Sequence, residues 1–402
     1  MKRQVVMNKN KETENQKTVV SGEFSGMTDE DFMVTRQIIL PLGRWYRENK
    51  RELPWRREKN PYHTWVSEIM LQQTRVEAVK EYYTRFLREL PSVRDLASCP
   101  EDRLMKLWEG LGYYSRVRNM QKAAMQIMHD FGGRIPEDAE TLKTLKGIGD
   151  YTAGAIASIA FGKMQAAVDG NVLRVLTRVL ADPSDISRQK YRKETEKKLT
   201  EAMKLELSVG ASYNPVTPGD VNQGMMDLGA TVCLPNGIPK CGECPLAKWC
   251  RAHAKGTETD YPVKSGKKPR RVEERTILLV RDGDRVILNR RPEKGLLAGM
   301  YEFPNLEGTL SEEEALNRVK ALGLPALYIR RLADSRHIFT HIEWHMTGYE
   351  IRVGSFPDSR FAENGEDTEK QSRSGLFFAE IVEIRRKYAV PSAYRAYAEV
   401  LK

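Results

Sequence analysis

Residues 145–171 read LKGIGDYTAGAIASIAFGKMQAAVDGN, and two glycines near the start of this stretch, Gly147 and Gly149, bracket one isoleucine. A helical pattern precedes them and an apolar helical run follows, which is typical of a helix-hairpin-helix turn. Glycine permits the tight backbone of such a turn, and free amides at the start of the next helix can bind a phosphate oxygen. An ordinary turn between helices would have the same pattern, so the stretch alone predicts two helices and leaves phosphate binding open.

The same stretch ends on a single acidic residue, Asp169, between Val168 and Gly170. The sequence VLRVLTRVL that follows is a helical pattern, so Asp169 is placed to cap the start of that helix. A capping position keeps a carboxylate ionised, and it is therefore compatible both with a purely structural role and with a chemical one.

The whole chain has 402 residues and a formal net charge of +10. This length predicts two or more domains, and the charge favours a polyanionic partner, nucleic acid before membrane, with a solvated basic surface as the alternative. The first thirty residues are polar, and no apolar stretch is long enough to span a bilayer. We expect a soluble intracellular protein, cytoplasmic and associated with the nucleoid in a bacterium.

The domain organisation of the chain can be inferred from its hydrophobic periodicity and from its segments rich in glycine and proline. Residues 32–254 are a succession of helical patterns, and residues 1–31 before them form a flexible tail. Residues 255–274 are basic with glycine and proline, as in a linker. Residues 275–402 open on RTILLVRDGDRVILNRR, a hairpin signal, and later contain a helical pattern. The sequence therefore predicts an all-α domain, a linker and a smaller α+β domain.

Four of the five cysteines lie together in CLPNGIPKCGECPLAKWC, which places Cys233, Cys241, Cys244 and Cys250 in a C-x7-C-x2-C-x5-C array. Four thiolates within so short a segment can close around one metal centre. Zinc sites more often have two short cysteine gaps, whereas this array has one, so the spacing favours an iron-sulfur cluster over zinc. Cys99 stands apart as an ordinary thiol.

Longer runs resemble a known family. LPWR (53–56), WVSEIMLQQTRV (65–76), GLGYYSRVRN (110–119) and VDGNVLRVLTR (168–178) are similar to the MutY family of adenine DNA glycosylases, within the helix-hairpin-helix superfamily that includes endonuclease III. The resemblance covers about residue 32 to the C-terminus and implies a 4Fe-4S cluster on the four cysteines. One departure is that the family usually has six residues in the first cysteine gap, where this chain has seven.

The resemblance also implies roles for two carboxylates. Removing adenine from deoxyribose needs an acid to protonate the leaving base and an anion to stabilise the oxocarbenium-like sugar. Glu68 falls on the family's general acid, and Asp169 on the residue that stabilises the sugar cation and forms a transient covalent link. From the residues alone, Glu68 could equally be a solvated helix glutamate.

Two further residues accompany these carboxylates. Tyr151 matches the family's active-site tyrosine, and Asn171 matches a polar residue beside it. Endonuclease III-like enzymes carry a lysine, the Schiff-base nucleophile for strand cleavage, where this chain has Tyr151. The resemblance therefore implies a monofunctional glycosylase.

The target adenine has to leave the DNA helix before it can be cut. By resemblance, the residues implied in this step are Gln73, Leu111 and Tyr113 for intercalation, Trp55, Arg56 and Gln223 for the adenine pocket, and Gly147 and Gly149 for phosphate contact. From the residues alone, Leu111 and Tyr113 could belong to the core, and Gln73 to the surface.

In the C-terminal region, GLLAGMYEFPNLEG (295–308) and SEEEALNRVKALGL (311–324) resemble a Nudix fold. The glutamates that Nudix hydrolases use for metal binding are not matched after Arg318, so nucleotide hydrolysis is not expected. In the MutY family this domain recognises 8-oxoguanine, and Phe339, Thr340 and His341 match its reading loop. An unremarkable turn between strands is the structural alternative.

Three classes of function are compatible with these features. The resemblance favours an adenine glycosylase that acts, as a monomer, on double-stranded DNA containing adenine opposite 8-oxoguanine or guanine. An endonuclease III-like glycosylase/lyase is disfavoured by Tyr151 and by the extra domain. A non-catalytic DNA-binding protein is disfavoured by the presence of both Glu68 and Asp169.

Overall fold

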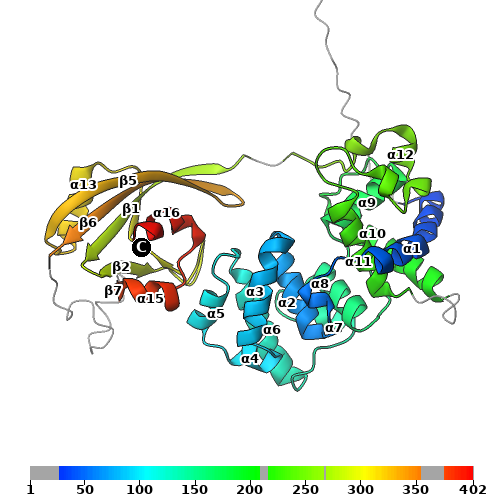
Figure 1. Ribbon diagram of the computed structural model, residues 1–402, viewed down its shortest axis with the longest axis horizontal. Coiled ribbons are helices and arrows are strands. Elements are labelled where there is room, and N and C mark those ends of the chain that lie inside the picture. Colours follow the sequence, from blue (N-terminus) through cyan, green and yellow to red (C-terminus); the bar gives the residue numbers. More distant parts are fainter. Residues whose placement is uncertain (1–26, 209–215, 267–268, 355–374, 402) are drawn as a thin grey trace, which may run out of the picture.

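The computed structural model describes residues 27–208, 216–266, 269–354 and 375–401, which form a helical part and a part built around one β-sheet (Figure 1). The predicted N-terminal tail falls mostly outside the described residues. The first helix, α1 (Asp29–Asn49), begins before residue 32 because Thr28 forms a capping box with Asp31.

The helical part consists of helices joined by short turns, as the periodicity predicts. After α1 and the 3-10 turn η1 (Pro54–Arg56), its helices are α2 (Pro61–Leu71), α3 (Val76–Glu89), α4 (Val93–Ser98), α5 (Glu101–Leu107), α6 (Ser115–Asp130), α7 (Ala139–Lys143), α8 (Asp150–Ala155), α9 (Gly170–Leu180), α10 (Gln189–Ser208), α11 (Pro218–Thr231) and α12 (Arg251–Lys255). A π-helical turn, η2 (Ile156–Ala160), extends α8, and three further 3-10 turns are η3 (Cys241–Glu243), η4 (Ala247–Trp249) and η5 (Glu258–Asp260).

Apolar side chains of the helical part pack into two separate cores. One core, around Trp108, is formed by α2 to α8, and the other, around Leu173, by α1 together with α9 to α11. Helix α1 therefore packs against α10 and α11 and not against α2, its neighbour in the sequence (Figure 1). An ion pair between Arg47 and Asp220 (2.9 Å) joins α1 to α11.

The turn between α7 and α8 has the geometry that its glycines predict. Gly147 has a φ of +81°, in the left-handed region, and a Cβ there would lie 2.6 Å from the Cβ of Asn119. Gly149 is the N-cap of α8 and provides no capping side chain. The predicted helix-hairpin-helix is confirmed.

The sheet part has the strand order β3-β2-β1-β6-β5, and β4 and β7 pair with β1 and β2 respectively. Its strands are β1 (Arg271–Asp282), β2 (Arg285–Arg290), β3 (Tyr301–Glu302), β4 (Asn305–Glu307), β5 (Ala326–Ile338), β6 (Ile342–Val353) and β7 (Leu376–Glu380). Strands β1 and β6 are parallel, and the other pairs are antiparallel. The predicted hairpin at Gly283 joins β1 to β2.

Helices cover both faces of this sheet. Ala315 and Val319 of α13 (Glu312–Ala321) pack on one face, and Tyr394 and Tyr397 of the C-terminal segment pack on the other. That segment contains α15 (Ile381–Arg386), η7 (Ser392–Tyr394), α16 (Arg395–Ala398) and η8 (Glu399–Leu401). The mixed sheet between helices agrees with the predicted Nudix-like α+β fold.

The sheet part is also packed directly onto helices α2 to α8. Met300 and Ala389 of the sheet part are buried in the core of these helices. Lys106 of α5 donates from Nζ to the carbonyl oxygens of Ile384 and Tyr388, at 3.0 Å each. The two parts therefore share apolar surface in addition to the linker.

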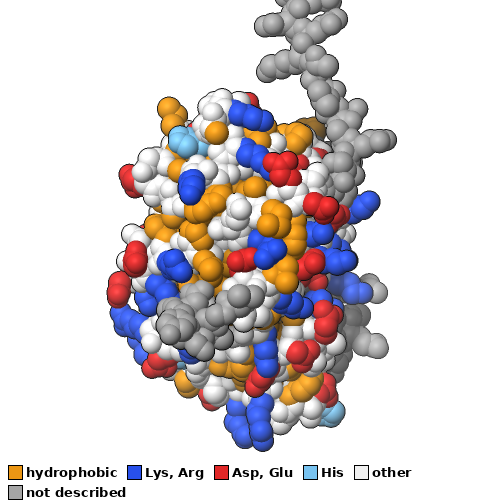
Figure 2. All heavy atoms as spheres, turned by 90° about the vertical axis from the view of Figure 1, so that its right-hand side faces the viewer, with side chains coloured by type: hydrophobic (Ala, Val, Ile, Leu, Met, Phe, Trp, Pro, Cys, Tyr) orange, Lys and Arg blue, Asp and Glu red, His pale blue; other side chains and the backbone are white. Residues whose placement is uncertain are grey.

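No helix in the described ranges combines the length and apolar character needed to cross a bilayer. On the side of the molecule that carries α1 and α12, positive, negative and apolar side chains are interspersed (Figure 2). The excess positive charge is therefore not gathered on this side.

Candidate active site

A solvent-open cavity of about 570 Å³ lies where the two halves of the helical part meet. Helices α2 and α8 contribute Glu68 and Tyr151, and the start of α9 contributes Asp169 and Asn171. The four residues that the resemblance implies for catalysis therefore line one cavity, although they come from both cores.

Glu68 lies in the middle of α2 and is only 6% exposed. The hydroxyl of Tyr151 donates to its Oε2 at 2.6 Å. The pKa of Glu68 is raised to about 7, chiefly by burial and also by the nearby Asp169, while the Tyr151 hydrogen bond and the Arg56 charge oppose the rise. A carboxyl with this pKa is protonated in a substantial fraction of molecules at neutral pH and can act as a general acid.

Asp169 caps helix α9, as predicted. Its Oδ1 accepts from the backbone amides of Asn171 (2.8 Å) and Val172 (2.9 Å), and its Oδ2 accepts from Nδ2 of Asn171 (2.7 Å). Burial raises the pKa of Asp169, and these hydrogen bonds oppose the rise because they stabilise the ionised form. The helix N-terminus adds a favourable dipole for an anion.

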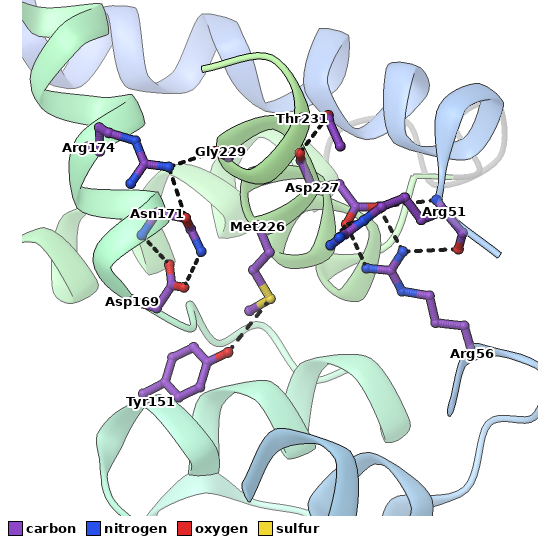
Figure 3. Close-up of polar contacts among 10 residues, drawn as sticks. All are labelled: Arg51, Arg56, Tyr151, Asp169, Asn171, Arg174, Met226, Asp227, Gly229 and Thr231. Atoms are coloured by element: carbon purple, nitrogen blue, oxygen red, sulfur yellow. Dashed lines mark hydrogen bonds and ion pairs between the residues drawn. The ribbon is translucent and has the colours of Figure 1, made fainter. Parts of the chain in front are cut away.

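A second set of contacts holds Asn171 in place (Figure 3). Arg174 donates from Nη2 to Oδ1 of Asn171 (2.9 Å) and to the carbonyl oxygen of Gly229 (2.6 Å). Its Nε donates to the carbonyl oxygen of Cys233 at 2.9 Å. Arg174 thus connects Asp169, through Asn171, to the start of the cysteine loop.

The hydroxyl of Tyr151 also points toward the sulfur of Met226 on α11, at 3.7 Å (Figure 3). Burial and the nearby Glu68 carboxyl raise the pKa of Tyr151 well above its usual value, so the phenol remains a hydrogen-bond donor. Among the described residues, the cavity lining contains no lysine.

The remaining residues predicted near the extruded base are divided by the structure. Trp55, Arg56, Gln223 and Gln73 line the cavity. Leu111 does not reach it and is 6% exposed within the core of α2 to α8. In the structure, Leu111 has the position of a core residue, and its intercalation stays a prediction.

Tyr113 lies apart from this cavity, in a second one of about 420 Å³ between the helical and sheet parts. It adopts a left-handed φ of 47° and is half-exposed. Its hydroxyl lies 3.0 Å from Oγ1 of Thr340. Tyr113 is therefore placed on the surface between the two parts.

The same cavity is lined by the predicted reading loop, Phe339, Thr340 and His341, which joins β5 to β6. Phe339 packs edge-on against Trp344, with ring centroids 4.8 Å apart, and its amide donates to the carbonyl oxygen of Ile342 at 2.8 Å. Phe339 thus anchors the loop, and the Thr340 hydroxyl is left at its tip.

The four clustered cysteines line one small cavity beside α9 and α11, and none of the four forms a disulfide. The extra residue in the first gap lies in an exposed loop, where Gly237 has a φ of +74°. The longer gap therefore does not remove any of the four cysteines from the cavity.

This donor set fits a metal centre with four thiolate ligands. Burial raises the pKa of Cys244 to about 11, so cation binding is needed to hold such a thiol in its thiolate form at neutral pH. Arg178 donates from Nη1 to Sγ of Cys233 at 3.3 Å, a contact that favours negative charge on the sulfur. Cys241 also lies near His253 and Glu258, whose ligand atoms are within 4.8 Å of one another and of its sulfur.

Comparison with known proteins identifies both parts of the chain. A family model described as "HhH-GPD superfamily base excision DNA repair protein" matches residues 66–202, and one described as "NUDIX domain" matches residues 276–400. The fold and the cavity thus define a DNA glycosylase of the helix-hairpin-helix superfamily with a Nudix-like domain.

Individual relatives narrow this class. The chain is 35% identical over 379 residues to the adenine DNA glycosylase of Mus musculus, covering 78% of this chain and 70% of that protein. It is 36% identical over 366 residues to the adenine DNA glycosylase of Homo sapiens, covering 74% of this chain and 64% of that protein. The chain belongs to the adenine DNA glycosylase family, the MutY family.

Among solved structures, one similar to this chain is a thermostable thymine-DNA glycosylase, with 26% identity and a TM-score of 0.48, covering 56% of this chain and 100% of that chain. Another is a non-covalent endonuclease III-DNA complex, with 24% identity and a TM-score of 0.45, covering 55% of this chain and 97% of that chain.

The sequence did not single out four residues at the cavity: Arg51 and Met226, which line it, and Arg174 and Asp227, which bind residues that line it. Arg174 and Asp227 each lie in an otherwise apolar helical run, LRVL and MMDLGA. A charge in such a run is a signal for a buried partner, because an unpaired buried charge is costly. That signal could have marked both residues, but it does not identify their partners.

Proposed function

We propose that this chain removes adenine paired with 8-oxoguanine, or with guanine, from duplex DNA by hydrolysing the N-glycosidic bond of the extruded nucleotide. The observation that carries the proposal is that Glu68, Tyr151, Asp169 and Asn171 line one cavity. The names of the mouse and human relatives support the removal of adenine from DNA.

In this mechanism Glu68 donates a proton to N7 of adenine, which makes the base a better leaving group. The burial of Glu68 and its raised pKa support this role, because a general acid has to carry its proton at the working pH. The Tyr151 hydroxyl orients the carboxyl through its hydrogen bond to Oε2.

Asp169 supplies the opposite charge. As the bond to adenine breaks, the sugar gains positive character, and the Asp169 carboxylate stabilises it and forms a transient bond to C1′ before water attacks. Two backbone amides and Asn171 keep this carboxylate ionised and fixed in direction.

The product of this reaction is an intact abasic strand. β-Elimination through a Schiff base needs an amine at the sugar, and the described cavity lining contains Tyr151 and no lysine. We therefore propose a monofunctional glycosylase.

Recognition of the opposite base is proposed for the loop of Phe339, Thr340 and His341. 8-Oxoguanine carries a proton on N7 where guanine has an acceptor, and the hydroxyl of Thr340 can accept from it. The position of this hydroxyl at the loop tip, beside Tyr113, supports the assignment.

We further propose that Cys233, Cys241, Cys244 and Cys250 hold a 4Fe-4S cluster, whose chemical contribution when bound is to cross-link the cysteine loop beside α9. Protein purified without oxygen should contain about four iron and four sulfide ions per chain and be yellow-brown. Stoichiometric zinc without iron would instead indicate a mononuclear site.

One assay tests the enzymatic proposal. Duplexes carrying adenine opposite 8-oxoguanine, guanine or thymine are incubated with excess enzyme, with and without subsequent alkali. We expect adenine release fastest opposite 8-oxoguanine and strand breaks only after alkali. Efficient strand cleavage without alkali, together with borohydride trapping, would indicate a lyase instead.

A further inference from the structure

We propose that Asp227 is a positioning residue that fixes the direction and offsets the charge of the two arginines on the Arg56 side of the adenine cavity. The inference rests on the proposed function of that cavity. Asp227 lies on α11, and its side chain is 1% exposed.

Both carboxylate oxygens of Asp227 accept hydrogen bonds from two arginines (Figure 3). Arg56 binds it with both terminal nitrogens, Nη1 to Oδ2 at 2.7 Å and Nη2 to Oδ1 at 3.0 Å. Arg51 donates to Oδ1 from Nε (2.8 Å) and Nη2 (2.5 Å), and its backbone amide donates to Oδ2 (3.3 Å). Bidentate hydrogen bonding of this kind fixes the plane of a guanidinium as well as its distance from the carboxylate.

These hydrogen bonds determine which N–H groups of Arg56 are free to bind a molecule in the cavity. Nη1 and Nη2 bind Asp227, and Nη1 also donates to the carbonyl oxygen of Arg51 at 3.2 Å, whereas Nε is buried and has no hydrogen-bond partner among the described residues. Arg56 also lies over the ring of Tyr46, 5.3 Å from its centroid. The side chain is therefore held from two sides while one donor stays unpaired in a residue that lines the cavity.

Asp227 also reduces the net positive charge of the two arginines beside the cavity. Burial alone would raise the pKa of Asp227, but the hydrogen bonds and charges of Arg56 and Arg51 outweigh burial and lower it. One buried anion thus accompanies two cations, and one positive charge remains in excess next to the cavity.

Glu68 is the group that experiences this excess charge. The groups that face Glu68 are Tyr151, Asp169 and Arg56. The Tyr151 hydrogen bond lowers the Glu68 pKa, Asp169 raises it, and Arg56 is the cation that lowers it. Arg51, Arg75 and Arg192 are the other cations that line the cavity. Since a charge a few ångströms away shifts a buried pKa by about one unit, the state of the Asp227 network should move the pH dependence of base release.

The test uses two substitutions with opposite expected signs in the full-length protein. Asp227→Asn keeps the shape but removes the anion, so Arg56 favours ionised Glu68 more strongly. We expect the alkaline limb of single-turnover adenine release to move down by about one pH unit, a loss of about fivefold at pH 7. Arg51→Gln removes one cation, and we expect the limb to move up by a smaller amount.

A matched control comes from the same helix. Asp220 of α11 pairs with Arg47 at 2.9 Å and does not line the cavity. Asp220→Asn removes a comparable ion pair, and it should leave the alkaline limb in place. Asp227→Glu, which keeps the charge, should restore most of the limb position that Asp227→Asn loses.

A second readout does not depend on catalysis. The Glu68 carboxyl can be titrated by 13C NMR of glutamate-labelled protein, with its resonance assigned by its loss in Glu68→Gln. In this titration we expect Asp227→Asn to lower the Glu68 pKa and Arg51→Gln to raise it. If Asp227→Asn and Arg51→Gln both leave the titration unchanged, or shift it in the same direction, Asp227 is only a structural residue and the inference is wrong.

The two proposals fail differently. If the parent protein releases no adenine at any pH, the proposed function fails, and the titration of Glu68 still decides the role of Asp227. If Asp227→Asn does not fold, the direction of the Arg51→Gln shift decides.

Discussion

The two carboxylates of the cavity occupy contrasting surroundings. Glu68 lies mid-helix in the core of α2 to α8 and receives a hydrogen bond from the Tyr151 side chain. Asp169 lies at the start of α9 and receives two backbone amides and the amide of Asn171. Glu68 is buried and Asp169 is half-buried, so burial favours a proton more strongly on Glu68. The number and kind of donors add to this difference and favour a charge on Asp169.

The largest expected effect comes from removing either group. Glu68→Gln removes the acid and Asp169→Asn removes the anion, while both keep the shape of the side chain. Each should lower single-turnover adenine release by about 10²-fold to 10⁴-fold and leave DNA binding, measured by gel shift, largely intact. Near-normal base release by either variant would overturn the assignment of the two roles.

A smaller effect should follow from loosening Asp169 without removing it. Asn171→Ala deletes the hydrogen bond to Oδ2, and a hydrogen bond to a charged group is worth about 1.5 to 3 kcal/mol, so we expect a loss of about tenfold to a hundredfold in base release. Asn222 is a suitable control because it is a buried asparagine that bonds Ser158 and Gln165 outside the cavity. If Asn222→Ala slows base release as much as Asn171→Ala does, a general loss of packing around the site explains both effects.

Removing the Tyr151 hydroxyl tests the surroundings of the other carboxylate, Glu68. It stabilises ionised Glu68, so Tyr151→Phe should raise the Glu68 pKa and move the alkaline limb of base release to higher pH. Base release should also fall about tenfold at low pH, because the carboxyl loses its orienting partner. Tyr191→Phe removes a tyrosine–carboxylate bond to Asp182, and because neither residue lines the cavity, this variant should move neither the limb nor the rate. A limb that moves to lower pH would contradict the prediction.

The smallest effect should come from the reading loop, which touches neither carboxylate. Thr340→Val keeps the shape of the side chain but removes the hydroxyl, so it should narrow the preference for 8-oxoguanine over guanine several-fold, about 0.5 to 1.5 kcal/mol. Thr340→Ser should preserve the ratio.

Because Thr340→Val also removes the contact with Tyr113, Tyr113→Phe serves as its control. An unchanged ratio in Thr340→Val would move the discrimination to Phe339, His341 or the backbone.

Much of this site could be predicted from the sequence because its signals are local. The glycine turn, the cap at Asp169 and the spacing of the cysteines each depend on residues close together in the chain. The family resemblance then brought Glu68 and Tyr151 to the same site, and the structure places both in one cavity with Asp169.

The remainder depends on contacts between distant segments. Arg51 and Arg56 meet Asp227 only because the chain returns through α11, more than 170 residues later. Nothing in the local pattern states which buried arginine pairs with which buried aspartate. The burial of Leu111, and of Met300 and Ala389 in a helical core, likewise depends on tertiary packing.

The packing of α1 against α10 and α11 has a consequence for synthesis on the ribosome. The segment that contains Glu68 and Tyr151 can bury most of its core once α8 and η2 have emerged, because α2 to α8 are contiguous in the chain, and Met300 and Ala389 join that core later. Helix α1, although made first, has to wait for α9 to α11 before its apolar face is covered. Early in translation the nascent chain therefore exposes an unpaired amphipathic helix, and domains fold as their segments emerge. The acid side of the cavity is complete before the side that holds Asp169, so catalytic competence arrives with the last helices of the glycosylase part and not with the first.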